Sequence, residues 1–339
     1  MATLTSANLP TVNKYDVSKS IIEPLFMGQD YMSYMDVMPN VAGTIVIDKF
    51  KQLGGITGAL APLGTFSGAA GEIGDTVTIT PVRREAEVAF AGNSLYNKIK
   101  GQLMRAGHEF DNVDGTVVKN ILLDLIGQGV KSDFNKQLWL SSAAGGTGGF
   151  DQYDGLFDAA FNVTANKINR SDLATEQPSD AALVAGRGLD ILKGLYDAAS
   201  PELLEAGNHA YFVSGDIADD YMATTLESSN FAAAGYGAMV NGVPQLTYRG
   251  IPLIVRRDWD VAIASNVANI NGATNAAETH RAMLTTKDAF VVATDFNENS
   301  VEQWYSNDNK EYRFRVAYSI GVALKDAKLA AYYTPDNMA

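Results

Sequence analysis

The feature that most constrains this chain is a glycine-rich stretch from Leu53 to Thr76, which holds seven glycines and no charged residue before Glu72. Glycine brings no side chain to a core and lets the backbone extend or pack closely. A long segment without regular structure is uncommon inside a compact domain, where such segments usually carry binding. The stretch therefore predicts an extended arm that is ordered by a partner surface.

Extended segments flank this stretch on both sides. The first part of the chain, up to about residue 35, is predicted to be an arm, because Pro10 and Pro24 interrupt any helix there. From Thr76 to Phe90, apolar and polar residues alternate as in a half-buried strand, and this pattern predicts an extended hairpin. These segments contribute little independent core, so neighbouring molecules are expected to order them.

A long helix is predicted after the arm. Asp114 is a suitable N-cap, and apolar residues recur at helical spacing as far as Leu140. We expect a helix of about 25 residues on this pattern. Gly127 and Gly129 each cost about 1 kcal/mol relative to alanine inside a helix, which predicts a bend or a close contact there. A glycine-rich loop before Gly155 ends the helix.

The rest of the chain mixes helices and strands. A helix is predicted over 181–199, a buried strand over 209–215, and a second helix directly after that strand. Strand patterns dominate from Leu246 onward, and apolar residues alternate with arginines from Tyr312. Helices and strands do not alternate regularly, and no period of 20 to 50 residues repeats. The predicted class is therefore α+β.

Composition excludes several classes of protein. A chain of 339 residues suffices for one large domain or two modest ones. The sequence shows neither a run of about 18 apolar residues nor a signal-peptide pattern, so we expect no membrane association. Because the chain has no cysteine, disulfides, thiolate metal sites and cysteine nucleophiles are excluded, and a cytosolic environment is favoured.

The charge is strongly negative and unevenly distributed. The net charge is −13, and residues 171–310 alone hold 19 acidic against 8 basic side chains. Proteins that bind nucleic acid through its phosphates carry basic patches, since each cationic contact releases counterions. The chain as a whole should therefore repel DNA.

The usual catalytic and metal-binding patterns are missing from the sequence. His108, His209 and His280 stand far apart, and no serine occupies a G-x-S-x-G turn. The glycines at 145–149 lack the following Lys-Ser or Lys-Thr of a phosphate-binding loop. An EF-hand-like spacing that starts at Asp295 lacks the glycine and the glutamate that such a loop needs. We expect no enzymatic activity, no cofactor and no metal site.

The order of these elements resembles the major capsid proteins of tailed double-stranded DNA bacteriophages, which have the Hong-Kong-97-like fold. In that family an N-terminal arm, an extended β-hairpin called the E-loop, a long spine helix, a central A-domain and long P-domain strands follow one another. The resemblance rests on their order over nearly the whole chain. The positions that carry it are Asp133, Leu138, the GGTGG run before Gly155-Leu156, Tyr248 to Pro252, Asp288 to Asp295 and Tyr312 to Val322.

The resemblance implies a division of the chain into five parts. They are an N-terminal arm over 1–52, an E-loop over 53–107, a P-domain segment with the spine helix over 108–178, an A-domain over about 179–285, and returning P-domain strands over 286–339.

The function that the resemblance implies is self-assembly. Many copies would tile an icosahedral shell as hexamers and pentamers around packaged double-stranded DNA, which the shell encloses without sequence-specific binding. A portal and a separate scaffolding protein are the other expected partners, and the expected location is the virion capsid, assembled in the host cytoplasm. One alternative is an encapsulin-type compartment that encloses cargo enzymes. Another is a soluble hydrolase or binding protein whose site is assembled from distant residues.

Basic residues of the predicted E-loop are the candidates for intersubunit contact. Between Pro81 and Gly107, five basic residues outnumber two acids, which gives this segment a charge of +3. One interpretation is a solvated strand edge, where such charges discourage strand pairing. The other is that the arm lies on the acidic surface of an adjacent subunit, which would confer orientation and specificity. The candidates are Arg83, Arg84, Lys98, Lys100 and Arg105.

Overall fold

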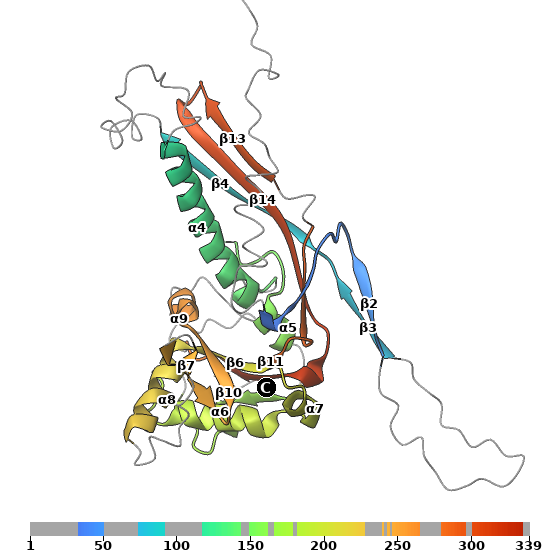
Figure 1. The fold of residues 1–339 in the computed structure, drawn as a ribbon, viewed down its shortest axis with the longest axis vertical. Helices are drawn as coiled ribbons and strands as arrows, with labels where there is room; N and C mark the ends of the chain where they lie inside the picture. Colours follow the sequence, from blue (N-terminus) through green and yellow to red (C-terminus); the bar gives the residue numbers. More distant parts are fainter. Residues whose placement is uncertain are drawn as a thin grey trace, which may run out of the picture.

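The structure is a computed structural model. It describes residues 33–50, 74–91, 117–143, 149–161, 166–178, 182–227, 239–240, 243–244, 246–264, 279–295 and 300–334. Residues 1–32 of the predicted arm, the Asp114 cap and most of the glycine-rich stretch lie outside these residues. The described part is elongated, with a long sheet and one helix at one end and a second sheet with several helices at the other (Figure 1).

The long sheet has five strands arranged around β14. Its strands are β1 (Asp36–Met38), β4 (Val82–Ala91), β12 (Phe290–Ala293), β13 (Ser300–Ser306) and β14 (Glu311–Leu324). The end of β14 pairs with β12, whereas its first part lies between β13 and β4, always antiparallel. Tyr312, Phe314 and Val316 are buried while Arg313 and Arg315 lie on the opposite, outer face, as their alternation predicts.

Helix α4 (Val117–Leu140) packs along this sheet (Figure 1). Its buried positions recur every four residues, from Leu122 to Leu138, and the Phe134 ring meets the Tyr318 ring of β14 edge to face at 6.0 Å. The predicted helix of about 25 residues is confirmed with 24 residues. The expected close contact is absent at Gly129, where an added Cβ would meet nothing within 4 Å.

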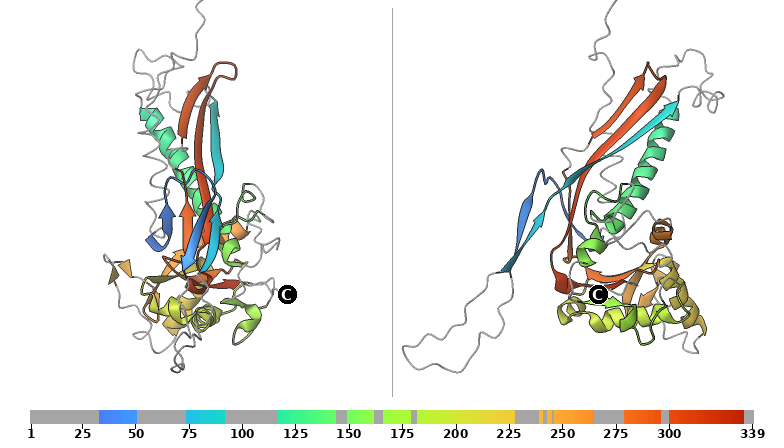
Figure 2. Two further views of the ribbon diagram at one scale, coloured as in Figure 1. Left: turned by 90° about the vertical axis from the view of Figure 1, so that its right-hand side faces the viewer. Right: turned by 180° about the vertical axis from the view of Figure 1, so that it is seen from behind.

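A two-stranded ribbon, β2 (Ile45–Phe50) and β3 (Gly74–Ile79), projects away from the body of the molecule (Figure 2). It corrects the hairpin predicted over Thr76–Phe90, because β3 pairs with β2 and β4 pairs with β14. The alternation of apolar residues specifies extended backbone but not the partner strand. Pro81, between β3 and β4, packs closely against Gly321 of β14. A Cβ added to Gly321 would lie only 3.0 Å from the Pro81 Cα.

The second sheet has six strands in the order β5, β15, β11, β6, β10, β9. Their bounds are β5 (Lys167–Asn169), β6 (His209–Ser214), β9 (Thr247–Tyr248), β10 (Ile251–Arg256), β11 (Ala282–Thr286) and β15 (Ala330–Thr334). The pairs β5–β15 and β6–β10 are parallel, and the other pairs are antiparallel. The sheet is therefore mixed.

Helices lie on both faces of the six-stranded sheet (Figure 1). The helices are α5 (Leu156–Phe161), α6 (Arg187–Ala198), α7 (Pro201–Glu205), α8 (Gly215–Glu227) and α9 (Arg257–Ala264), with 3-10 turns η3 (Arg170–Asp172) and η6 (Ala327–Leu329) and a small ribbon of β7 (Met239–Val240) and β8 (Val243–Pro244). In β6, Tyr211 and Val213 pack against α6 and α8, while Phe212 faces α4. The predicted buried strand is thus confirmed, whereas the helix predicted over 181–199 begins only at Arg187 because Gly186 has a φ of +84°.

An aromatic cluster joins the two sheets. The Trp139 ring at the end of α4 lies 4.8 Å from that of Phe212 and 4.9 Å from that of Trp259, and Phe157 of α5 lies 4.7 Å from Trp259. Trp139, Phe157 and Trp259 are fully buried. Close aromatic pairs add about 0.5 to 1.5 kcal/mol each beyond their buried area, so this cluster fixes α4 on the six-stranded sheet. Among the described residues, no helix has the length and apolar character needed to cross a membrane.

Candidate functional site

Strand β4 carries the two described candidates for intersubunit contact. Its side chains alternate between half-buried and exposed along the whole strand, so the adjacent residues Arg83 and Arg84 point to opposite faces of the long sheet. Arg83 lies on the outer face, in register with Ser319 of β14, and Arg84 lies on the face toward α4. Lys98, Lys100 and Arg105 lie outside the described residues.

Arg84 is committed to contacts within the subunit. Its guanidinium donates a hydrogen bond of 2.5 Å to the Gly149 carbonyl, in the loop that leads to α5. Burial raises the pKa of the Tyr318 hydroxyl to about 12, against the lowering effect of the Arg84 charge beside it. The sequence placed both arginines together as contact candidates, but only Arg83 is presented to solvent.

The outer face of the long sheet carries a ladder of charges around Arg315. The Arg315 Nε lies 3.0 Å from a Glu85 carboxylate oxygen and 3.7 Å from a Glu87 carboxylate oxygen. Both acids of the predicted arm are thereby paired within the subunit. Of the residues that the structure describes, none forms a hydrogen bond or an ion pair with Arg83. Its charge is therefore available to another molecule.

A second polar cluster lies where β6 runs into α8. Asp216 accepts hydrogen bonds from the Ser214 hydroxyl and, at 2.8 Å, from the Thr279 hydroxyl, and its Oδ2 lies 2.5 Å from the buried His280 Nδ1. Burial raises the pKa of Asp216, but the hydrogen bond and the charge of His280 outweigh burial and hold it at about 2. Ser214 and His280 both bind Asp216 rather than each other, so they do not form a catalytic triad.

Asp260 of α9 borders the same cluster. One of its carboxylate oxygens accepts a 2.8 Å hydrogen bond from the Gly215 backbone N–H, and the other is buried without a partner. Burial, followed by the negative charge of Asp216, raises the pKa of Asp260 to about 7. The Asp260 carboxylate packs tightly against the Gly215 backbone, because a Cβ added to Gly215 would lie 2.5 Å from it. Sequence analysis gave these residues no role, because nothing in their spacing shows that they meet.

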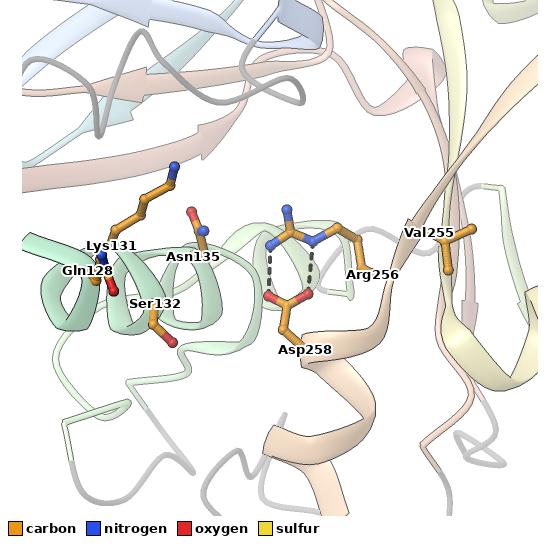
Figure 3. A pocket seen from close by; sticks show the side chains of 7 residues that line it. All are labelled: Gln128, Lys131, Ser132, Asn135, Val255, Arg256 and Asp258. Carbon is orange, nitrogen blue, oxygen red and sulfur yellow. Dashed lines mark hydrogen bonds and ion pairs between the residues drawn. The ribbon is translucent and has the colours of Figure 1, made fainter. Parts of the chain in front are cut away.

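A polar groove of about 380 Å³ separates α4 from the corner where β10 runs into α9 (Figure 3). Arg256 and Asp258 face each other across this corner and share two hydrogen bonds, of 3.1 and 2.7 Å. The groove is lined by Gln128, Lys131, Ser132, Asn135, Val255, Arg256 and Asp258. It offers hydrogen-bonding groups but no nucleophile paired with a base.

Comparison with known proteins identifies the fold. No protein-family model matches the sequence, and no curated protein matches it. A chain of the satellite phage P4 procapsid matches with a TM-score of 0.56 at 9% identity, over 94% of this chain and 90% of that one. A chain of the cyanophage P-SCSP1u capsid matches with a TM-score of 0.54 at 14% identity, over 90% and 87% of the two chains.

A third match is a virus-like particle from Pyrococcus furiosus, with a TM-score of 0.50 at 8% identity, over 95% of this chain and 99% of that one. At these identities the similarity defines the fold alone. The described chain is a mixed helix and sheet protein with the fold of phage capsid proteins, which confirms the resemblance in the order of the sequence elements.

Proposed function

We propose that this protein is the major capsid protein of a tailed double-stranded DNA bacteriophage. The observation that carries the proposal is the match to phage capsid chains over about nine-tenths of both lengths, which leaves little room for a separate catalytic domain. Hexamers and pentamers of the chain would form an icosahedral shell. Repeated burial of surface between subunits, and no active site, would supply the free energy of assembly.

The proposal assigns the described elements to the parts of a Hong-Kong-97-like subunit. In this proposal α4 is the spine helix, the long sheet belongs to the P-domain, and the six-stranded sheet is the core of the A-domain. The β2–β3 ribbon is the base of the E-loop. The E-loop range predicted from the sequence, 53–107, also contains β4, which pairs with β14 of the long sheet.

The partners and the location follow from the proposed role. Further copies of the chain, a portal and a separate scaffolding protein are the protein partners, and assembly would occur in the host cytoplasm before the chain becomes part of the virion. The packaged DNA would be enclosed without sequence-specific contacts. The net charge of −13 suits a container, because a wall that bound DNA tightly would hinder packaging and ejection.

A protein compartment is the second candidate function. The match to the virus-like particle from Pyrococcus furiosus covers 95% of this chain at a TM-score of 0.50, below the 0.56 and 0.54 of the phage capsid chains, so an encapsulin-type shell around cargo proteins is the weaker alternative. The contents of the particle distinguish the two candidates.

Electron microscopy of the purified protein tests assembly, and the contents of native particles test the function. Closed shells of uniform diameter that protect double-stranded DNA from nuclease would support the capsid. Shells that contain protein cargo and no DNA would favour the compartment. A protein that remains monomeric or dimeric at every salt concentration, even with a scaffolding protein added, would overturn both.

A further inference from the structure

The joint between α4 and α5 contains buried polar oxygens that lack partners. The hydroxyls of Ser141 and Ser142, directly after α4, are fully buried, and Asp158 of α5 is 3% exposed. Each has a side-chain oxygen without a hydrogen-bond partner. Leaving such a group unpaired costs about 1 to 3 kcal/mol, so orphaned atoms in a native site call for a bound water or ion.

Two carboxylates converge on this joint. The Asp154 carboxyl and the Ser142 hydroxyl both lie close enough to the Asp158 carboxyl to shift its pKa. Asp154 is exposed, and one of its oxygens accepts a 2.9 Å hydrogen bond from the Ala143 backbone N–H. Among the described residues, neither carboxylate has a cationic partner. Burial, followed by the hydrogen bond and the charge of Asp154, raises the pKa of Asp158 to about 7, so a bound cation would offset the cost of ionising both carboxyls.

Backbone hydrogen bonds connect the two sides of the joint. The Gly155 N–H donates a 2.7 Å hydrogen bond to the Ser141 carbonyl, and the Ser142 N–H donates one of 2.8 Å to the Phe150 carbonyl. A Cβ on Gly155 would lie 2.9 Å from the Leu138 carbonyl oxygen, so only glycine permits this approach. These backbone contacts fix the segments that carry the Ser142, Asp154 and Asp158 side chains, as a preformed binding site requires.

We propose that Asp154, Asp158 and the Ser142 hydroxyl bind a divalent cation of the calcium class. Calcium prefers six to eight oxygen ligands in flexible geometry, and it accepts carboxylates, hydroxyls and waters together. Exposed Asp154 gives the ion a route from solvent, and water completes its coordination. Magnesium suits the site less well, because it demands near-ideal octahedral geometry. The ion would tie the end of α4 to α5.

The site is weak by its composition. No cluster of three or more acidic, histidine or cysteine side chains suited to a metal occurs among the described residues, so only two carboxylates supply charge here. Sites with few charged ligands hold calcium with a Kd of about 10⁻⁴ to 10⁻³ M. The inference concerns one subunit and does not depend on the proposed shell.

Equilibrium dialysis against radioactive calcium, at constant pH and ionic strength, measures binding directly. We expect one calcium ion per chain in the parent protein, and loss of that ion in Asp158→Asn and in Asp154→Asn. Asp151→Asn is the matched control, because this exposed aspartate belongs to the same loop but lies outside the joint. It should bind calcium as the parent does. Asp154→Asn keeps the test valid if the buried variant fails to fold.

Thermal unfolding gives an independent readout. At calcium about tenfold above the Kd, the parent and Asp151→Asn should gain about 2 °C in Tm, and the two joint variants should gain nothing. Magnesium should give a smaller gain, and sodium chloride at equal ionic strength none. A parent protein that binds no calcium, or variants that bind it equally well, would overturn the proposal. So would an Asp158→Asn variant that is more stable than the parent while calcium affects neither protein, because the two carboxyls then share only a proton.

Discussion

Asp216 and Asp260 are neighbours at the end of β6, yet their environments move their pKa values in opposite directions. Asp216 receives hydrogen bonds from three side chains, and its pKa is about 2. Asp260 receives one from a backbone N–H, and burial beside the Asp216 charge raises its pKa to about 7. Near neutral pH, Asp260 therefore exchanges a proton in the folded state.

Replacing Asp260 by asparagine should remove the pH dependence that this carboxyl imposes on stability. A folded-state pKa of about 7, above the ordinary value of 3.8, means that the folded state holds the proton between these pH values while the unfolded state has lost it. The contribution of this carboxyl to the free energy of unfolding therefore falls as the pH rises from about 4 to above 7. Asparagine is neutral at every pH and keeps an acceptor for the Gly215 N–H.

The free energy of unfolding of Asp260→Asn should exceed that of the parent at pH 8.5, and the difference should disappear toward pH 5. Denaturant titrations of the subunit across this pH range measure it. Asp288→Asn, which removes an exposed aspartate of a turn, controls for the loss of one negative charge. Parallel pH profiles for the parent and Asp260→Asn would show that Asp260 stays ionised in the folded protein.

Two glycines, one within α4 and one between α4 and α5, serve opposite purposes. Gly129, inside α4, has nothing within 4 Å of an added Cβ, whereas Gly155 faces the Leu138 carbonyl oxygen at 2.9 Å and the Ser141 nitrogen at 3.0 Å. At Gly155 the obstructing atoms belong to the backbone, which cannot move aside like the end of a side chain. The fold therefore requires glycine after the helix but only tolerates it within.

We expect Gly129→Ala to stabilise the subunit by about 0.5 to 1 kcal/mol, since alanine loses less backbone entropy in a helix. Gly155→Ala should destabilise it by about 1 to 3 kcal/mol, since the methyl group forces the α4–α5 joint apart. Denaturant unfolding of the two variants beside the parent measures both effects. A Gly155→Ala variant as stable as the parent would show that the close packing at Gly155 is wrong, and a destabilised Gly129→Ala variant would contradict the open space at Gly129.

Periodicity in the sequence located the regular elements well. Apolar residues at helical spacing predicted α4, and the alternation from Tyr312 predicted β14, because both patterns follow from one buried face. The partner of a strand does not follow from its alternation, so the segment from Thr76 to Phe90 was expected to pair with itself and instead joins two different sheets.

The polar sites were less accessible to sequence analysis. Asp216 and His280 are 64 positions apart and meet only through the pairing of β6 with β11. The opposite roles of Arg83 and Arg84 depend on which face of β4 packs against α4. The composition of the segment does not predict which face that is. The charge of the segment was predictable, whereas the direction of each side chain required the structure.

At the scale of the whole molecule, the exposed charge of Arg83 matters through repetition. A solvent-exposed ion pair contributes only about 0.2 to 1 kcal/mol. In the proposed shell the same contact recurs in every subunit, so the small free energies of the individual ion pairs add up over the whole assembly. Arg83 stands on the outer face of the long sheet, next to acids already held by Arg315, and the molecule as a whole is strongly acidic. A neighbouring subunit therefore offers abundant negative partners.

We expect Arg83→Glu to lower the yield or the thermal stability of assembled shells at low ionic strength, with the deficit shrinking as salt screens the contact. The isolated subunit should keep the Tm of the parent, because Arg83 has no partner among the described residues. Arg84→Glu should instead destabilise the subunit itself, since it loses the hydrogen bond to Gly149.

Lys193→Glu is the control for this prediction, because it makes the same change in net charge at an exposed residue of α6. Light scattering of assembly and differential scanning calorimetry of shells would measure these effects. Equal assembly of the parent, Arg83→Glu and Lys193→Glu at low salt would show that Arg83 serves solubility and makes no contact between subunits.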